Sequence, residues 1–152
     1  MEDKICTFFG HRDIVLTENL KNRIYNEILK AIEFGSTIFY FGGYSKYDFL
    51  CLDIVNEIKN KFNYKITTVY CVSQERFLRK KTPYFDRNDY DSVIYLTPSF
   101  DGWYKSIYFR NLAMIDASSY IIFLVEEREN SGAYKAYQYA VKQKDKTIVN
   151  LL

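Results

Sequence analysis

Short runs of consecutive apolar residues alternate along this chain with longer stretches in which apolar residues recur every three or four positions. The continuous runs predict buried strands, and the periodic stretches predict amphipathic helices. The clearest helix follows Thr17, and Gly35 is placed to end it. Its apolar stripe recurs every fourth residue: Leu16, Leu20, Ile24, Ile28 and Ile32.

The same alternation continues to the end of the sequence. Further helices are predicted over Tyr47–Phe62, Trp103–Ala117 and Gly132–Lys144. Apolar strands alternating with helices indicate an α/β fold of Rossmann-like type, with a doubly wound, mainly parallel sheet and helices on both faces. Without repeats or linkers, residues 1–152 are expected to form a single domain. Strands are predicted at Lys4–Phe9, Thr37–Phe41, Ile66–Val72, Ser92–Leu96, Tyr120–Val125 and Thr147–Leu151.

One segment, Ser73 to Asp91, has no sustained period and contains Pro83. We predict an irregular excursion there, with one helical turn near Gln74 to Leu78. Two interpretations of this segment stay open. It is either a lid in which Tyr84 or Phe85 stacks on a base, or an uncommitted surface loop.

Composition narrows the function classes. Hydrophobic residues make up 48% and charged residues 26% of the chain, as in ordinary globular proteins. The net charge of +2 is too small to indicate a nucleic-acid partner or a membrane surface. The N-terminus has no apolar signal segment, and no window reaches the length of a membrane span, so we expect a cytoplasmic protein.

Metal and thiol chemistry are not expected. Cys6, Cys51 and Cys71 fall in apolar stretches and are predicted to be buried, reduced thiols. No cysteine pair has metal-ligand spacing, and His11 is the only histidine, so no metal site is predicted.

Three predicted strand-to-helix loops carry glycine where the ligand edge of a parallel sheet lies. Glycine lets the backbone approach a phosphate, and the free amides of a helix's first turn point at it. The alternative is that these glycines only end strands and start turns. The loop residues that we select are Gly10, His11 and Arg12, then Gly42, Gly43 and Ser45, then Ser131 and Gly132.

Charged residues strengthen this prediction. Arg12 follows the first strand closely and is a candidate clamp for a phosphate or carboxylate. Arg110, with Asn111 beside it, either reaches the ligand edge or pairs along its helix. Asp48 stands three residues after Ser45, so it either caps a helix or serves the ligand.

Several standard sites are missing from the sequence. The phosphate-binding lysine with its Ser or Thr partner does not occur, and no Gly-x-Gly-x-x-Gly follows the first strand. No serine nucleophile elbow is found either. P-loop hydrolases, typical nicotinamide enzymes and serine hydrolases are therefore not indicated.

Taken together, four motifs resemble those of the SLOG superfamily and, more narrowly, of the small bacterial proteins of the YpsA-like group. The resemblance covers Lys4 to Leu151. It implies a Rossmann-like domain that binds nucleotides or nucleotide-derived signals, with pocket residues drawn from Gly10, Arg12, Gly42, Gly43, Arg110, Ser131 and Gly132. The motifs are Phe8-Phe9-Gly10-His11-Arg12, Phe41-Gly42-Gly43 with Asp48, Arg110-Asn111-x-x-Met114-Ile115-Asp116, and Ser131-Gly132-Ala133.

The chain departs from one branch of that superfamily. The cytokinin-activating phosphoribohydrolases carry a Pro-Gly-Gly-x-Gly-Thr stretch followed by a glutamate at the last helix. This chain has Asn130-Ser131-Gly132-Ala133-Tyr134-Lys135-Ala136 there, and its glutamates Glu126, Glu127 and Glu129 come earlier. Cleavage of an N-glycosidic bond needs a carboxylate near the ribose, so this departure weighs against that reaction.

The leading hypothesis is a domain that senses or sequesters a nucleotide-like molecule without turning it over and without a cofactor. The first alternative is an enzyme of phosphoribohydrolase or deoxyribosyltransferase type, with Asp48 or a glutamate of residues 126–129 as the working carboxylate. The second is an interaction scaffold whose surface tyrosines dock a partner or a second copy of the chain in a homodimer. Those tyrosines are Tyr104, Tyr108, Tyr134 and Tyr137.

Overall fold

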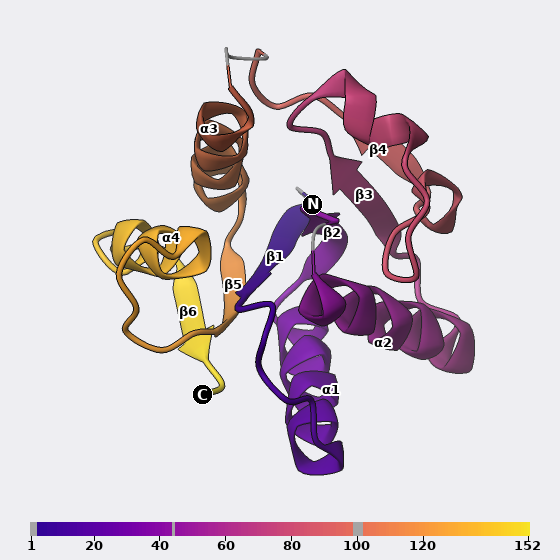
Figure 1. Cartoon of the computed structure of the whole chain (residues 1–152). Coiled ribbons are helices and arrows are strands. Elements are labelled where there is room, and N and C mark those ends of the chain that lie inside the picture. The colour runs from indigo at the N-terminus through magenta and orange to yellow at the C-terminus, as the bar shows by residue number, and fades with distance from the viewer. Residues whose placement is uncertain (1–2, 44, 99–101) are drawn as a thin grey trace.

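A computed structural model describes residues 3–43, 45–98 and 102–152. It contains one six-stranded sheet of order β4-β3-β2-β1-β5-β6, in which every strand pair is parallel (Figure 1). The parallel α/β architecture predicted from the sequence is therefore confirmed. The strands are β1 (Lys4–Gly10), β2 (Ser36–Phe41), β3 (Thr67–Cys71), β4 (Ser92–Ile94), β5 (Tyr120–Leu124) and β6 (Thr147–Asn150).

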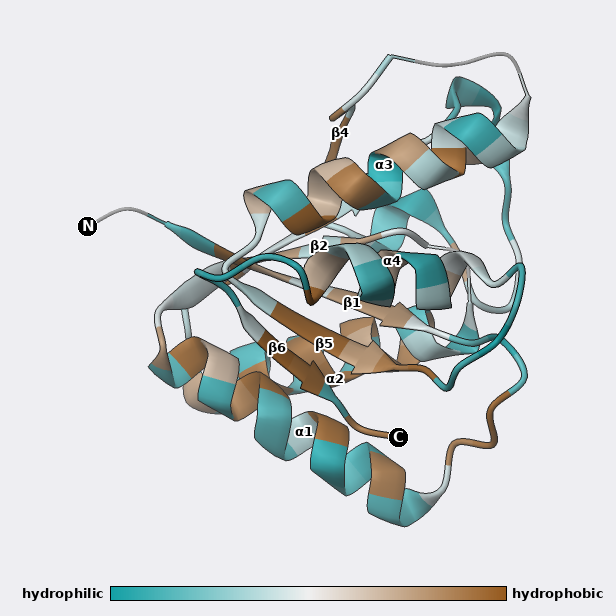
Figure 2. Cartoon of the chain, turned by 90° about the vertical axis from the view of Figure 1, so that its left-hand side faces the viewer, coloured by the Kyte–Doolittle hydropathy of each residue, from teal (hydrophilic) through white to brown (hydrophobic). Residues whose placement is uncertain are grey.

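In the described part of the chain, four α-helices cover the sheet on both faces. Helices α1 (Glu18–Glu33) and α2 (Lys46–Phe62) lie on one face. Helices α3 (Trp103–Ala117) and α4 (Gly132–Ala140) lie on the other, as Figure 2 shows with the sheet between the two pairs. Neighbouring strand residues serve opposite layers: Phe8 packs under α1 and α2, and Phe9 packs under α4. Of the described helices, none combines the length and the apolar character that crossing a bilayer requires.

Hydroxyl side chains begin three of these helices. Thr17, Ser45 and Ser131 accept hydrogen bonds from the third amide of α1, α2 and α4, at 3.1 to 3.2 Å. Helix α4 ends at Ala140 rather than at the predicted Lys144. The amide of Gln143 bonds to the carbonyl of Ala140 at 2.9 Å, and this tight turn leads the chain back into the sheet.

The segment between β3 and β4 holds two short 3₁₀ turns, Glu75–Arg79 and Arg87–Asp89. The predicted helical turn is thus present in 3₁₀ form. Phe85 is buried, with its ring 4.7 Å from that of Tyr70. Tyr84 is partly exposed and stands edge-on to Phe49. Since Phe85 belongs to the core, a lid in which Phe85 stacks on a ligand base is wrong.

The order in which strands are added to the sheet reverses at β1. From β1 the chain runs outward through β2, β3 and β4, and then returns to add β5 and β6 on the opposite side of β1. The carboxyl ends of β1 and β5 lie side by side, with Gly10 opposite Leu124. In open parallel sheets this reversal leaves a crevice in which ligands bind.

Candidate functional site

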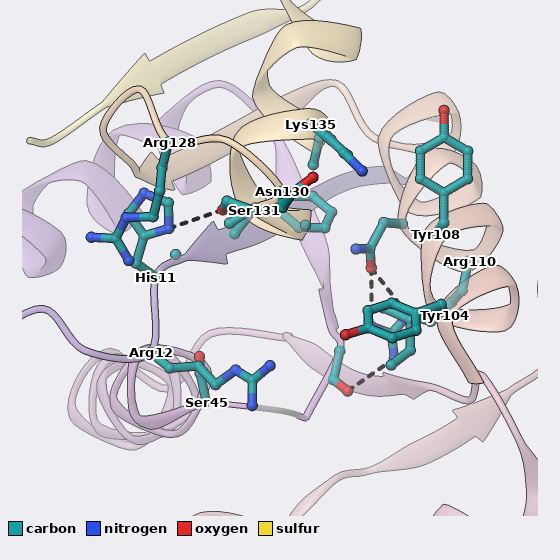
Figure 3. A pocket seen from close by; sticks show the side chains of 18 of the residues that line it. His11, Arg12, Ser45, Tyr104, Tyr108, Arg110, Arg128, Asn130, Ser131 and Lys135 are labelled. Atoms are coloured by element: carbon teal, nitrogen blue, oxygen red, sulfur yellow. Dashed lines mark hydrogen bonds between the residues drawn. The ribbon is translucent and has the colours of Figure 1, made fainter. Parts of the chain in front are cut away.

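A cavity of about 730 Å³ opens at the reversal point (Figure 3). Its walls come from the end of β1, the first turn of α2, the inner side of α3 and the loop that leads into α4. The volume is in the range of pockets that hold small organic molecules. The topology has therefore brought four segments, distant in sequence, around one space.

Ten of the eleven residues predicted at this edge line the cavity. Gly43 is not among the described residues that do so. Its φ of +66° is left-handed, and an added Cβ would lie 2.8 Å from Cε1 of Tyr70. The close packing of Tyr70 and Phe85 against Gly43 gives a structural reason for a glycine at this position. The ten are Gly10, His11, Arg12, Gly42, Ser45, Asp48, Arg110, Asn111, Ser131 and Gly132.

Two of the lining glycines have close neighbours behind the cavity. A Cβ at Gly10 would lie 2.4 Å from Cδ2 of Tyr47, whose buried ring donates its hydroxyl hydrogen to the Ile122 carbonyl at 3.1 Å. A Cβ at Gly42 would lie 2.9 Å from Nη2 of Arg110. These glycines let side chains pack against the backbone under the floor of the site.

Arg110 is buried and holds the ends of two strands. Its Nη1 donates to the carbonyl oxygens of Gly42 at 3.0 Å and Cys71 at 3.2 Å. Its Nε and Nη2 donate to Oδ1 of Asn111, at 3.3 and 3.0 Å. The side chain does reach the ligand edge, but it forms the floor and ties α3 to the sheet.

His11 is also buried and joins β1 to the segment before α4. Its backbone amide donates to the Leu124 carbonyl at 3.2 Å. On the ring, Nε2 lies 3.1 Å from the carbonyl oxygen and 3.0 Å from the amide nitrogen of Glu126. Nδ1 lies 3.2 Å from Oγ of Ser131 (dashed in Figure 3). His11 therefore fixes the position of the Ser131 loop.

The first turn of α4 faces the cavity through Ser131, Gly132 and Ala133. Ser131 Oγ accepts a hydrogen bond from the backbone amide of Tyr134, with an N–O distance of 3.1 Å. The amides of Gly132 and Ala133 lie beyond the reach of the helix's own carbonyl groups and are free for an anion. No described atom lies within 4 Å of an added Cβ at Gly132, so the space beside this turn is open.

Basic side chains ring the cavity: Arg12, Lys105, Arg128 and Lys135 line it with the buried Arg110. Arg128 joins two loops, because it donates to Asp13 at 2.8 Å and also to Glu126. The hydrogen bond from Arg128 lowers the pKa of the Asp13 carboxyl, and the two carboxylates raise the pKa of the Arg128 guanidinium. Arg128 and Lys135 escaped sequence reasoning, because neither directly follows a strand.

Helix α3 gives the cavity an aromatic wall made of Trp103, Tyr104 and Tyr108. The rings of Trp103 and Tyr104 stack with centroids 4.0 Å apart. Tyr104 is 73% and Tyr108 43% exposed, so both rings offer uncovered surface. The docking hypothesis groups Tyr104 and Tyr108 as surface tyrosines, but the sequence does not show that they lie across the cavity from Ser131.

Groups capable of covalent chemistry are scarce in the described part of the site. The three cysteines are buried, as predicted, and burial raises the pKa of the Cys71 thiol to about 12. Among the described residues no cluster of His, Cys, Asp and Glu could hold a metal. Three carboxylates are among the described residues that line the cavity: the buried Asp48, the exposed Glu129, and Asp13, which is ion-paired with Arg128.

No family model and no curated protein matches this sequence. Among solved structures, the chain is similar to the X-ray structure of TM1055, a target of the Northeast Structural Genomics Consortium. The two share 14% sequence identity and a TM-score of 0.56, over 90% of this chain and 68% of that chain. At this identity the likeness concerns the fold alone, and it agrees with the α/β Rossmann-like architecture described above.

Proposed function

We propose that this protein binds a nucleotide, or a phosphate compound derived from one, at the carboxyl edge of its sheet and does not turn it over. One observation carries the proposal: a single cavity joins free helix amides and basic side chains to an aromatic wall. The motif resemblance to the SLOG superfamily, together with the Rossmann-like fold, supports the same conclusion, and we propose that the chain is a member.

The phosphate end of the ligand belongs at α4. The free amides of Gly132 and Ala133 and the positive end of the helix dipole favour an anion there. Arg12 and Lys135 line the same cavity and add positive charge. Arg128 is engaged by Asp13 and Glu126, so its charge is already largely balanced.

The base end belongs at α3. Tyr104 and Tyr108 expose ring surface on the cavity wall, and base stacking on an aromatic side chain contributes roughly 1–3 kcal/mol. Figure 3 shows both tyrosines on the helix across the cavity from Ser131. A ligand with a phosphate at one end and a flat ring at the other matches these two walls.

Binding without turnover is favoured by what the residues around the anion site do. His11 is held by the backbone of Glu126 and by Ser131, which positions the α4 loop. The first turn of α4 carries no acidic residue to assist departure of a base. The buried thiols are unsuited to nucleophilic attack because burial raises their pKa.

One observation favours a second candidate, hydrolysis or transfer at an N-glycosidic bond. The buried Asp48 lines the same cavity, and glycosidic chemistry needs a carboxylate near the ribose. Glu129 and Asp13 also line the cavity, and Asp13 is ion-paired with Arg128.

Thermal shift with AMP, adenosine and ribose 5-phosphate tests the proposal. AMP at about a hundredfold excess over its Kd should raise Tm by roughly 5–10 °C, and each fragment should raise it less. A flat response to all three compounds would show that the proposed function is wrong. Chromatography of AMP after a day with the protein decides between the two candidates, because released adenine, lost in Asp48→Asn, would establish the enzyme.

A further inference from the structure

The ring of His11 is placed to accept either neutral tautomer. Nε2 lies 3.1 Å from the Glu126 carbonyl oxygen, which needs a hydrogen on Nε2. The same nitrogen lies 3.0 Å from the Glu126 amide nitrogen, which needs a lone pair on Nε2. One backbone residue thus offers a partner for both states of one ring nitrogen.

The hydroxyl of Ser131 responds to which tautomer is present. When Nδ1 carries no hydrogen, Ser131 donates its hydroxyl hydrogen to Nδ1, 3.2 Å away. When Nδ1 is protonated, the ring donates to Oγ instead. Oγ also accepts from the Tyr134 amide at 3.1 Å, and a hydroxyl has two acceptor positions and one donor. In this second state both acceptor positions are filled, and the hydroxyl hydrogen is free to turn into the cavity.

We infer that His11 is a positioning residue that controls the direction of the Ser131 O–H, and that a bound phosphate selects the ring protonated on Nδ1. This inference rests on the proposed function. In the ligand-bound state Ser131 donates to a phosphate oxygen, beside the amides of Gly132 and Ala133.

Without ligand each neutral tautomer leaves one hydrogen unmatched. With the hydrogen on Nε2, the ring donates to the Glu126 carbonyl and Ser131 donates to Nδ1, but the Glu126 amide loses its acceptor on the ring. With the hydrogen on Nδ1, the Glu126 amide donates to Nε2, and the Ser131 hydroxyl hydrogen needs a new acceptor. A phosphate oxygen supplies the acceptor, which is why the ligand shifts the balance.

Three segments of the chain bring charged groups to the part of the cavity that contains His11. Arg12 and Asp13 follow His11 directly, and the ion-paired Arg128 and Glu126 flank it from the loop before α4. Lys135 of α4 lines the same cavity. A doubly protonated ring would also carry a hydrogen on Nδ1 and donate it to Ser131. It differs from the proposed neutral ring because it keeps a hydrogen on Nε2 as well.

¹⁵N NMR of the imidazole ring measures which nitrogen of His11 carries the hydrogen, and the signal is unambiguous because the chain has one histidine. At pH 8 the free protein should show a ring whose hydrogen is shared between Nε2 and Nδ1. Saturating inorganic phosphate or AMP should move the hydrogen to Nδ1. In Ser131→Ala the ligand-induced change should vanish, and AMP affinity should fall about tenfold or more.

Thr17→Ala is the matched control, because it removes a hydroxyl cap from α1 and none of its atoms line the cavity. It should keep both the affinity for AMP and the ring response. If AMP binds by calorimetry while the His11 ring nitrogens stay unchanged, the inference is wrong and the proposed function survives. If neither phosphate nor AMP binds, both are wrong.

Discussion

The guanidinium group of Arg110 donates to the carbonyl oxygen of Gly42 at 3.0 Å, and this bond ties helix α3 to the end of strand β2. The same Nη1 reaches the carbonyl of Cys71 at the end of β3. Arg110 therefore supports the floor of the cavity from below. A loss of ligand binding on its removal would report damage to the fold as readily as loss of a ligand contact.

Arg110→Ala should lower the free energy of unfolding by roughly 2–4 kcal/mol, because it leaves buried carbonyls without their charged donor. Urea unfolding followed by fluorescence measures this as a lower midpoint with an unchanged slope. Lys105→Ala, at an exposed position of the same helix, is the control and should stay within about 0.5 kcal/mol of the parent. Equal midpoints for the two variants would contradict the structural role of Arg110.

Gly10→Ala should destabilise the fold by about 1–3 kcal/mol, since the new methyl group meets the ring of Tyr47 at 2.4 Å. The ring cannot move freely, because it is 1% exposed and its hydroxyl is bonded to Ile122. A lower Tm by differential scanning calorimetry is the expected result. Gly10→Ala combined with Tyr47→Leu should recover part of the loss, and no recovery would show that the contact is not the cause.

Gly132→Ala, unlike Gly10→Ala, should leave stability nearly unchanged and weaken AMP binding. Apart from its chain neighbours and the backbone of its own helix, no described atom lies within 4 Å of the added methyl group, so the unfolding free energy should change by less than about 0.5 kcal/mol. The methyl group crowds the free amides at the start of α4, and AMP affinity should fall about tenfold. Calorimetric titration beside a melting curve measures both. Unchanged affinity would mean that the phosphate lies elsewhere.

Asp91 gives the fold a defined acid sensitivity. Burial raises the pKa of its carboxyl, but hydrogen bonds from the Thr68 amide and Lys59 outweigh burial, and the net pKa is lowered. A carboxyl whose folded pKa lies below its unfolded value of about 3.9 stabilises the fold above that value and loses this contribution as pH falls through the folded pKa. Unfolding free energy between about pH 5 and pH 3 should therefore fall less steeply in Asp91→Asn. An identical slope would contradict the role of Asp91.

The order of elements could be predicted from the sequence because a fully buried strand such as Tyr120–Leu124 and an amphipathic helix such as Glu18–Glu33 each show their period locally. The excursion after β3 could not. Phe85 is buried against residues that come from elsewhere in the chain, among them Tyr70 and Gly43, and no local sequence pattern indicates those contacts.

Some features of the candidate site could likewise be predicted from the sequence, and others could not. The loops after β1 and before α4 could be found because strand ends share one sheet edge. The ion pair of Arg128 with Asp13 joins residues 115 positions apart, and the aromatic wall depends on which side of α3 turns inward. These features depend on tertiary packing and become visible only in the assembled fold.

The proposed phosphate site is tested most directly by calorimetric titration of AMP into a matched pair of lysine variants. Lys135 of α4 lines the cavity, whereas Lys142, beyond the end of that helix, is exposed and does not belong to the described lining. Both changes to alanine remove one positive charge. We predict that the parent and Lys142→Ala bind AMP alike, and that Lys135→Ala binds about fivefold or more weakly. Absence of AMP binding to the parent, or equal affinities in the two variants, would contradict the account.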